Sequence, residues 1–345
     1  MQYEKTVNFR NCIFNTVSST PSTSKEAYDF AANRHPEAAV NNSFEIMKNT
    51  INSWKRNDNP PPVKQIEGCN IILSTEKWKN MLTFPVGEES HTIKTLEYKE
   101  GECVSVVFYD EILIKAFSKC TTISVDGTFR CVPKIGQAKQ MITLMGKVND
   151  KFFPFIWVLT NSKTQKNYEN VFYLIREKLL GSFVPILCIS DFEKAMQNSI
   201  KTVFPEINLQ GCYFHYTYDL RKYFQKCGIF EQIKAAHLAL SSKIIVAKRK
   251  LYNLPLLPPQ HIQRGFYLIK NGIEQDPVLK QILAKFLIYF ERQWVKKTNA
   301  NTLSVFQAPD RTNNSQERYH RMLNKLIRKR PRFPKFCCNY NLIFI

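Results

Sequence analysis

Three acidic residues stand where a folded sheet could bring them together. Asp126 follows the β-branched run Thr121–Val125, and Asp191 follows the apolar run Pro185–Ser190. Glu317 lies near the start of a later helical pattern. Mg²⁺ prefers carboxylate oxygens and usually needs only one or two carboxylates per ion. Two such ions can activate water or a 3′-hydroxyl and stabilise the leaving oxygen in phosphoryl transfer. These positions therefore predict metal-assisted chemistry on phosphodiesters.

Each acid also has an ordinary structural interpretation. Asp126-Gly127 after a strand is typical of a turn, and Asp191 before a helix is typical of an N-cap. Glu317 in a first helical turn suits the helix dipole. Singly, the turn, the cap and the dipole are the simpler explanations, whereas the order of the three acids favours a site.

The elements that must position these acids follow one another from Glu102 onward. Strand and helix patterns alternate there, and Val148-Asn149-Asp150 is typical of a hairpin turn. The order predicts an α/β fold, a mixed sheet with helices on its faces. Strands are predicted at Cys103–Tyr109, Thr121–Val125, Gln140–Lys147, Phe152–Thr160, Pro185–Ser190 and Ile207–Gly211, and helices at Asp110–Ser118, Asn167–Leu180, Phe192–Phe204 and Tyr213–Cys227.

The remaining segments are mostly helical. Residues 229–299 are predicted to be helical throughout, and a last helix is predicted at Thr312–Lys329, for which Asn313-Asn314-Ser315 offers N-cap side chains. Residues 63–100 favour short strands and turns. Further helices are predicted at Ser24–Ala31, Ser43–Trp54, Glu231–Leu251, His261–Ile273 and Pro277–Lys297, and Asn59–Pro62 is typical of a linker.

The charge points to a polyanionic partner. The 345 residues include 49 Lys+Arg and 29 Asp+Glu, so the net charge is +20. Nucleic acid is the first expectation, because basic side chains release counterions condensed on phosphates. An anionic membrane surface is a less favoured partner. The remaining alternative is a basic surface that only keeps the protein soluble. No apolar run approaches the ~20 residues of a membrane-spanning helix, the first residues lack a signal-peptide pattern, and the ten scattered cysteines are typical of a reduced intracellular protein.

Two basic clusters stand out. Lys325–Lys335 carries six cations in eleven residues and is typical of a phosphate-contacting strip, a nuclear-import signal or a solvated charge run. Lys243–Lys250 lies in the helical block. Beside Asp126, Phe129 is expected to be buried and Arg130 to contact DNA.

A series of motifs in this order resembles the transposase domain of Mutator-like elements. The resemblance covers roughly residues 103–336. It is carried by Ser124-Val-Asp-Gly-Thr-Phe-Arg130, Phe153-Pro-Phe155, Asn167-Tyr-Glu-Asn-Val-Phe172, Ser190-Asp-Phe-Glu-Lys-Ala195, Phe204-Pro205, Gly211-Cys-Tyr-Phe-His215 and Arg311-Thr-Asn-Asn-Ser-Gln-Glu-Arg-Tyr-His-Arg321.

This resemblance implies a ribonuclease H-like fold, interrupted by an all-helical insertion before the last catalytic helix. It implies that Asp126, Asp191 and Glu317 are catalytic and bind Mg²⁺ or Mn²⁺ during DNA strand cleavage and strand transfer in the nucleus. DNA is the implied partner, no membrane is expected, and homo-oligomers are common among such enzymes. The expected DNA contacts are Arg130, Arg321, Lys325, Arg328, Lys329, Arg330 and Arg332.

Three further residues are expected to support the acids. Cys212 and His215 match the family's Cys-x-x-His element and share one helix face, so both could meet a metal or a DNA strand. They make only half of a four-ligand zinc site, and a structural role at the strand–helix corner is the alternative. His320 could orient Glu317 or touch phosphate, and its alternative is a partly exposed residue with no task.

The N-terminal region departs from the family. Residues 25–36 faintly resemble the tail of a FLYWCH-type finger, but position 33 is Asn and upstream only Cys12 is a soft ligand, so zinc is not expected to be fully coordinated. The predicted organisation is a finger remnant with helix and linker at 1–62, core at 63–228, insertion at 229–310, final core helix and basic strip at 311–336, and a tail at 337–345. The alternative function is a domesticated or decayed DNA- or chromatin-binding protein without catalysis. An unrelated basic interaction protein fits the motif series poorly.

Overall fold

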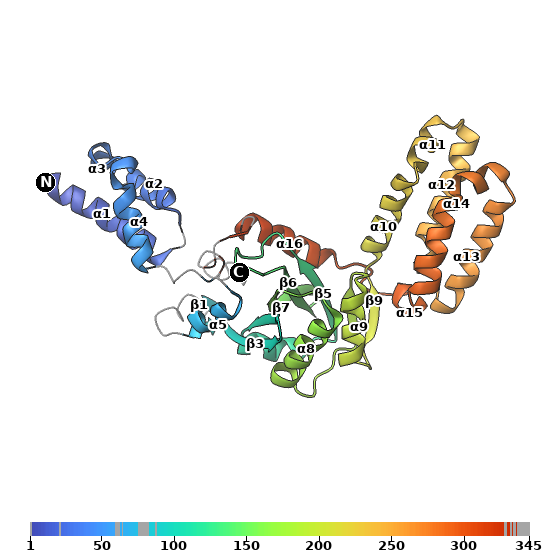
Figure 1. Ribbon diagram of the computed structural model, residues 1–345, viewed down its shortest axis with the longest axis horizontal. Coiled ribbons are helices and arrows are strands. Elements are labelled where there is room, and N and C mark those ends of the chain that lie inside the picture. Colours follow the sequence, from blue (N-terminus) through green and yellow to red (C-terminus); the bar gives the residue numbers. More distant parts are fainter. Residues whose placement is uncertain are drawn as a thin grey trace.

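The computed structural model describes residues 2–20, 22–58, 63, 65–74, 83–86, 88–327, 330, 331, 333 and 336. Figure 1 shows three parts in a row: a small bundle of helices α1–α4 at one end, a sheet with helices on its faces in the middle, and a helical block, α11–α14, at the other end. The expected carboxylate site belongs to the middle part.

Four helices form the N-terminal bundle: α1 (Gln2–Ser19), α2 (Ser24–Arg34), α3 (Pro36–Asn41) and α4 (Phe44–Asp58). The sequence predicted α2 and α4, and it missed α1 and α3. Thr23 and Glu26 begin α2 with a reciprocal capping box. Cys12 lies on α1, and the ring of His35 packs edge-on against Phe9. Hydrophobic packing accounts for this bundle, whose buried residues are Phe9, Ile13, Val17, Ala27, Tyr28, Ala31, Ala38, Met47 and Ile51.

The central sheet has seven strands in the order β3-β4-β7-β6-β5-β8-β9. The pairs β5–β8 and β8–β9 are parallel, and the other pairs are antiparallel. This mixed sheet with covering helices confirms the expected ribonuclease H-like α/β fold. The strands are β3 (Lys94–Glu100), β4 (Cys103–Tyr109), β5 (Thr122–Thr128), β6 (Gln140–Val148), β7 (Lys151–Thr160), β8 (Leu187–Ser190) and β9 (Asn208–Gly211).

Local chemistry explains the boundaries of these strands. Asn149 and Asp150 have positive φ angles of 46° and 62°, as the tight turn between β6 and β7 requires. The predicted hairpin turn is therefore confirmed. The region 63–100 also contains a helix, α5 (Glu67–Ser74), which the sequence did not predict, beside the separate hairpin of β1 (Thr83–Val86) and β2 (Glu89–Thr92).

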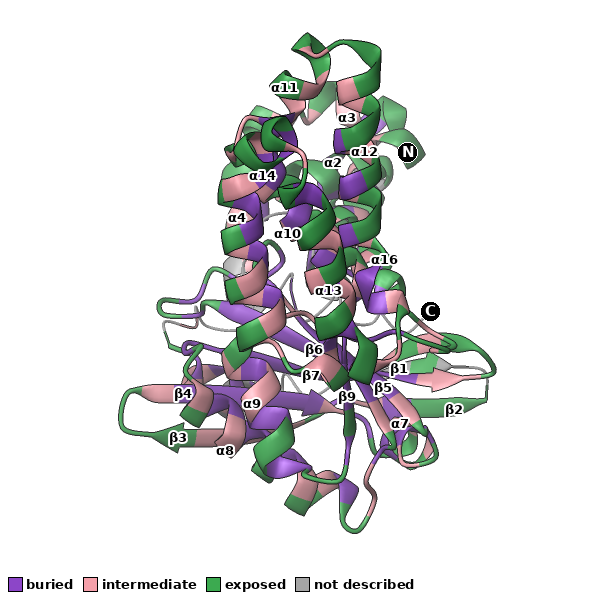
Figure 2. Ribbon diagram, turned by 90° about the vertical axis from the view of Figure 1, so that its right-hand side faces the viewer, coloured by how far each residue is buried: buried purple, intermediate pink, exposed green. Residues whose placement is uncertain are grey.

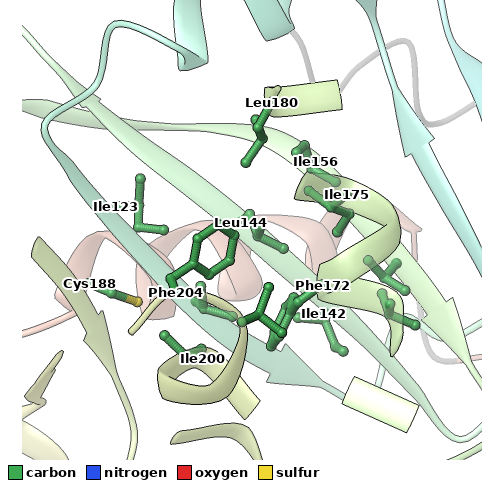
Figure 3. Packing of buried hydrophobic residues seen from close by; sticks show 14 of the residues in the cluster. Ile123, Ile142, Leu144, Ile156, Phe172, Ile175, Leu180, Cys188, Ile200 and Phe204 are labelled. Carbon is green, nitrogen blue, oxygen red and sulfur yellow. The ribbon is translucent and has the colours of Figure 1, made fainter. Parts of the chain in front are cut away.

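Helices cover both faces of the sheet. On one face α7 (Glu111–Phe117), α8 (Gln165–Ile175), its π-helical extension η2 (Arg176–Leu180) and α9 (Lys194–Val203) enclose a large apolar cluster. On the other face α5 and α16 (Asn314–Ile327) enclose a second cluster. The strands are largely buried between these layers (Figure 2). Figure 3 shows part of the first cluster, including Ile123, Ile142, Leu144, Ile156, Phe172, Ile175, Leu180, Cys188, Ile200 and Phe204.

The helical insertion follows α10 (Tyr213–Lys226) and has its own apolar core. Its helices are α11 (Ile229–Ala235), α12 (Leu238–Tyr252), α13 (Pro259–Glu274) and α14 (Pro277–Phe290), followed by the π-helical turn η4 (Glu291–Lys297) and the short α15 (Ala300–Leu303). The prediction of a single helix at Glu231–Leu251 is wrong, because α11 ends at Ala235 and a separate helix, α12, begins at Leu238. His237 accepts a hydrogen bond from the backbone N–H of Leu240 and caps the new helix.

Two glycines test how tightly the core and the insertion are packed. A Cβ on Gly211, at the end of β9, would lie 2.2 Å from Cζ of Phe192, whereas one on Gly272 in α13 would meet nothing within 4 Å. We expect Gly211→Ala to lower the free energy of unfolding by about 1–3 kcal/mol, because the ring must move. Gly272→Ala is expected to raise it by about 0.5–1 kcal/mol through helix propensity. Urea unfolding followed by circular dichroism measures both, and equal midpoints for the two variants would contradict the packing.

Candidate active site

The two aspartates lie at the ends of adjacent parallel strands. Val125 on β5 is in register with Ser190 on β8, so Asp126 and Asp191 each come one residue after a paired position. Neighbouring strands are about 4.8 Å apart, which brings the two carboxylates close together. The turn interpretation of Asp126 is wrong, because β5 continues to Thr128. Asp191 does not cap α9 directly, since it accepts from the backbone N–H of Glu193 and the helix begins at Lys194.

Two polar contacts hold helix α16 over β5, and the distance between them along the helix matches the distance between them along the strand. Ser124 Oγ donates to Gln316 Oε1 at 2.5 Å, and His320 Nδ1 lies 3.5 Å from Asp126 Oδ2. Two residues along a strand and four along a helix both span about 6–7 Å, so the two contacts repeat in step. Gln316 Nε2 also donates to the backbone carbonyl of Thr143 on β6. These contacts bring Glu317, the neighbour of Gln316, to the aspartates.

The start of α10 is tied to the start of α16. Cys212 is fully buried, and its Sγ donates to Asn313 Oδ1 at 2.9 Å. The backbone N–H of Tyr213 donates to the carbonyl of Arg311 at 2.9 Å. The side chain of Asn313, one of the three residues expected to offer a cap for α16, therefore accepts a hydrogen bond from Cys212. Of the two interpretations of Cys212, the contacts support the structural one.

His215 lies against the third acid. Its Nε2 is 3.3 Å from Glu317 Oε1, and its Nδ1 is buried and has no hydrogen-bond partner in the part of the chain that the structure describes. Burial lowers the pKa of His215, but Cys212, Glu317 and Asp126 together raise that pKa to about 11. His215 is therefore cationic at neutral pH. The hydrogen bond from His215 in turn lowers the pKa of Glu317.

The acids and histidines form one electrostatic cluster. Burial and the charge of Asp191 raise the pKa of Asp126 to about 7, and burial raises the pKa of Asp191. The negative charge of Glu317 also raises the pKa of both aspartates. Burial lowers the pKa of His320 to about 4, so this imidazole is neutral. The alternative of a partly exposed His320 is wrong, because the residue is buried, and the contact of its imidazole is with Asp126 rather than with the expected Glu317.

The donor set fits a hard cation at the two aspartates. Both carboxylates are largely removed from water and repel each other, which is the arrangement that a divalent ion relieves. Within the described residues, however, no group of three or more His, Cys, Asp and Glu side chains is close enough to hold a metal. Asp126 and Asp191 are the residues that could hold an ion, while Glu317 is held by His215.

The expected DNA-contacting residues are only partly described. Arg130, Arg321, Lys325 and Arg330 are exposed, and the backbone N–H of Arg330 donates to the carbonyl of Arg130. Arg321 contributes to the lowered pKa of Glu317, so it lies beside the cluster. The other expected contacts, Arg328, Lys329 and Arg332, fall outside the described residues.

Sequence reasoning missed Lys163. The positive charge of Lys163 lowers the pKa of Asp191 and so opposes the larger effect of burial. The Nζ of Lys163 lies 3.8 Å from the ring centroid of Phe129. Phe129 is 50% exposed, so the expectation of a buried ring is wrong. A signal was present, because β7 runs parallel to β5 and Lys163 follows its carboxyl end, at the same sheet edge as Asp126 and Asp191.

Comparison with known families agrees with this geometry. Residues 122–218 match the family model of the MULE transposase domain. This segment is similar to the MULE transposase domain. The match confirms the resemblance over that range and indicates a transposase-related function. The transposase domain contains Asp126, Asp191, Cys212 and His215, whereas Glu317 lies beyond the insertion and outside the match.

No curated protein was found that matches the chain. Among the described residues, no helix combines the length and the apolar character needed to cross a membrane.

Proposed function

We propose that the protein is a transposase of the DDE type, which cleaves DNA and transfers strands with Mg²⁺ or Mn²⁺. The observation that carries this proposal is the pair Asp126 and Asp191 on adjacent parallel strands, with Glu317 brought to them by α16. The MULE transposase domain supplies the biological context. Asp126, Asp191 and Glu317 are the proposed catalytic residues.

Each residue of the cluster has a distinct task in this mechanism. Asp126 and Asp191 would hold the divalent ion, which supplies an activated oxygen nucleophile and stabilises the leaving oxygen. His320, neutral and buried, orients the carboxylate of Asp126. His215, cationic, holds the carboxylate of Glu317 in place. Phe129 and Lys163 form an exposed cation–π pair beside the cluster. In this mechanism Lys163 could bind a phosphate and the ring of Phe129 could stack on a base.

DNA as the substrate is supported by the charge. A net charge of +20 favours a polyanion, and the exposed Arg321 lies close enough to Glu317 to lower its pKa. The basic strip Lys325–Lys335 has the composition of a nuclear-import signal, and we propose a nuclear location on that basis.

A nicking assay tests the proposal. We expect the purified chain to convert supercoiled plasmid to nicked circles with Mg²⁺ or Mn²⁺, and we expect no conversion in EDTA. Asp191→Asn is expected to lower the rate at least about 100-fold, since it removes a charged metal ligand. Asp150→Asn is the matched control, because Asp150 is exposed at the β6–β7 turn. Equal nicking by wild type and Asp191→Asn would contradict catalysis at this cluster.

The second candidate is a DNA- or chromatin-binding protein without catalysis. The observation in its favour is that Glu317 is engaged by His215, so that the described cluster offers no three-residue metal site. This candidate predicts DNA binding with no metal-dependent nicking by the wild-type chain.

A further inference from the structure

A cleft of about 1350 Å³ opens where the edge of the sheet meets the helical insertion. One wall is formed by α9 and the edge strand β9, and the other by η4 and the chain through α15. Figure 1 shows α9, β9 and α15 side by side at this junction, and α15 contacts β9. The lining includes none of the three acids Asp126, Asp191 and Glu317, so the cleft is a separate surface.

The charge of the cleft is of one sign. Lysine is the only charged residue type among the described residues that line it, as Lys194, Lys201, Lys296 and Lys297. Lys296 pairs with Glu291 at 2.9 Å, and Lys201 Nζ donates to the carbonyls of Pro205 and Ile207.

Two lysines keep their charge available. Lys194 on α9 and Lys297 on η4 come from opposite walls, and Lys194 Nζ donates to the backbone carbonyl of Lys297 at 3.4 Å. Neither of them forms an ion pair with the described residues. Two cations that line one cleft, neither of them paired with a carboxylate of the described residues, favour an anionic ligand.

The rest of the lining suits nucleobases. Phe306 is 45% exposed and offers an aromatic face on which a base can stack. Amide side chains both donate and accept hydrogen bonds, as base edges do. The exposed amides that line the cleft are those of Asn208, Asn299 and Asn301. Three further amides in the lining, those of Gln197, Asn198 and Gln210, already donate hydrogen bonds within the protein.

The cleft also begins next to the proposed catalytic cluster. Phe192, which lines it, directly follows Asp191, and Gln197 Nε2 donates to the carbonyl of Asp191 at 2.7 Å. A chain of phosphates in the cleft would therefore lead away from the carboxylates.

We propose that this cleft binds a single strand of DNA, with phosphates at Lys194 and Lys297 and a base stacked on Phe306. The assignment to DNA rests on the proposed function. A single strand is inferred because the amides and Phe306 can reach base edges and faces only where bases are unpaired. A duplex would present its phosphates and leave these groups unused.

Binding in EDTA tests the lysines without any cleavage. Fluorescence anisotropy would follow a labelled single strand of about 20 nucleotides across a salt series. We expect Lys194→Gln/Lys297→Gln to bind at least about 10-fold more weakly and to lower the magnitude of the slope of log K against log salt by about 1.4, two phosphates at about 0.7 each. The matched control is Lys151→Gln/Lys178→Gln, which removes two exposed lysines outside the cleft and should bind like wild type.

A second variant tests the stacking. Phe306→Ala is expected to weaken single-strand binding by roughly 5- to 150-fold and to reduce the quenching of a 2-aminopurine base in the strand. Duplex of the same sequence should be affected far less. Tyr173→Ala is the control, because Tyr173 is equally exposed but lies on α8, outside the cleft.

Three results would overturn the inference. The first is a lysine pair variant that binds like its control, and the second is a Phe306→Ala effect as large on duplex as on single strand. The third is displacement of the strand by inorganic tripolyphosphate at equal phosphate concentration, which would identify a site for small polyphosphates. Nicking by a protein whose cleft variants bind normally would overturn this inference and leave the proposed function standing. Cleft-dependent binding by a chain that never nicks would support the inference and overturn catalysis.

Discussion

Asp126→Asn is expected to abolish metal-dependent nicking while making the metal-free protein more stable above neutral pH. The loss of activity, at least about 100-fold, follows from replacing one of two charged ligands by a neutral amide, which binds a hard cation more weakly. The fold should survive, since Gly127 donates its backbone N–H to Asp126 Oδ1 and an asparagine oxygen accepts the same hydrogen bond. The nicking assay with Asp150→Asn as control measures this half of the prediction.

The stability half depends on the sign of the pKa shift. Burial and Asp191 raise the pKa of Asp126 to about 7 from the ordinary value of 3.8, so the folded state holds this proton more tightly than the unfolded state does. Its contribution to stability is therefore lost as pH rises from about 4 to about 7. Asparagine does not titrate, so the variant avoids this loss. At pH 8 in EDTA we expect Asp126→Asn to raise the free energy of unfolding by roughly 2–4 kcal/mol. At pH 4 we expect almost no change in that free energy.

Urea unfolding in EDTA at the two pH values checks this. The change should appear in the midpoint, with the denaturant slope unchanged. A gain of equal size at both pH values would mean that packing, rather than charge, is responsible. A loss at pH 8 would mean that the carboxylate is stabilised by its surroundings, and the repulsion inferred between Asp126 and Asp191 would be wrong.

The strands that carry the aspartates were predictable because their signal is local. β4 begins and ends at the predicted residues, and β8 was visible as an apolar run covered on both faces. The ends of parallel strands gather at one sheet edge, so Asp126 and Asp191 could be placed together from sequence order and fold class alone. The MULE transposase domain spans this same region.

The partners of these acids were not predictable, because their spacing is too large for any local rule. Ser124 and Gln316 are 192 residues apart, and Cys212 and Asn313 are 101 apart. A helix pattern shows which residues share a face, but not which strand that face meets or in what register. His320 was therefore assigned to Glu317, its helical neighbour, although it contacts Asp126 across the interface.

The insertion shows a different limit. Its helices were found from their apolar periodicity, but the break at His237 was missed because histidine is a rare helix cap. The cleft beside β9 was also invisible, since its walls come from α9 and from η4, about a hundred residues later. Surfaces between two parts of a chain depend on tertiary docking, which periodicity does not encode.

Trp157→Ala is expected to cause the largest loss of stability of any change considered. Trp157 lies on β7, is completely buried and donates from Nε1 to the hydroxyl of Tyr319 on α16 at 2.7 Å. Removing the indole leaves a cavity in the cluster between the sheet and α16 and should cost about 3–5 kcal/mol. Urea unfolding measures the cost, and Tyr173→Ala, which removes an exposed ring, should change it by less than about 0.5 kcal/mol.

The hydrogen bond itself can be separated from the packing with a double-mutant cycle. Trp157→Phe keeps a ring but leaves the Tyr319 hydroxyl buried without its donor, at a cost of about 1–3 kcal/mol. Tyr319→Phe removes the acceptor, and the double variant should cost clearly less than the two single changes added together. Simple additivity would show that the two side chains do not act as a pair. Because α16 also carries Glu317 and His320, a coupled pair means that the same contact that stabilises the fold sets the distance of the third acid from the two aspartates.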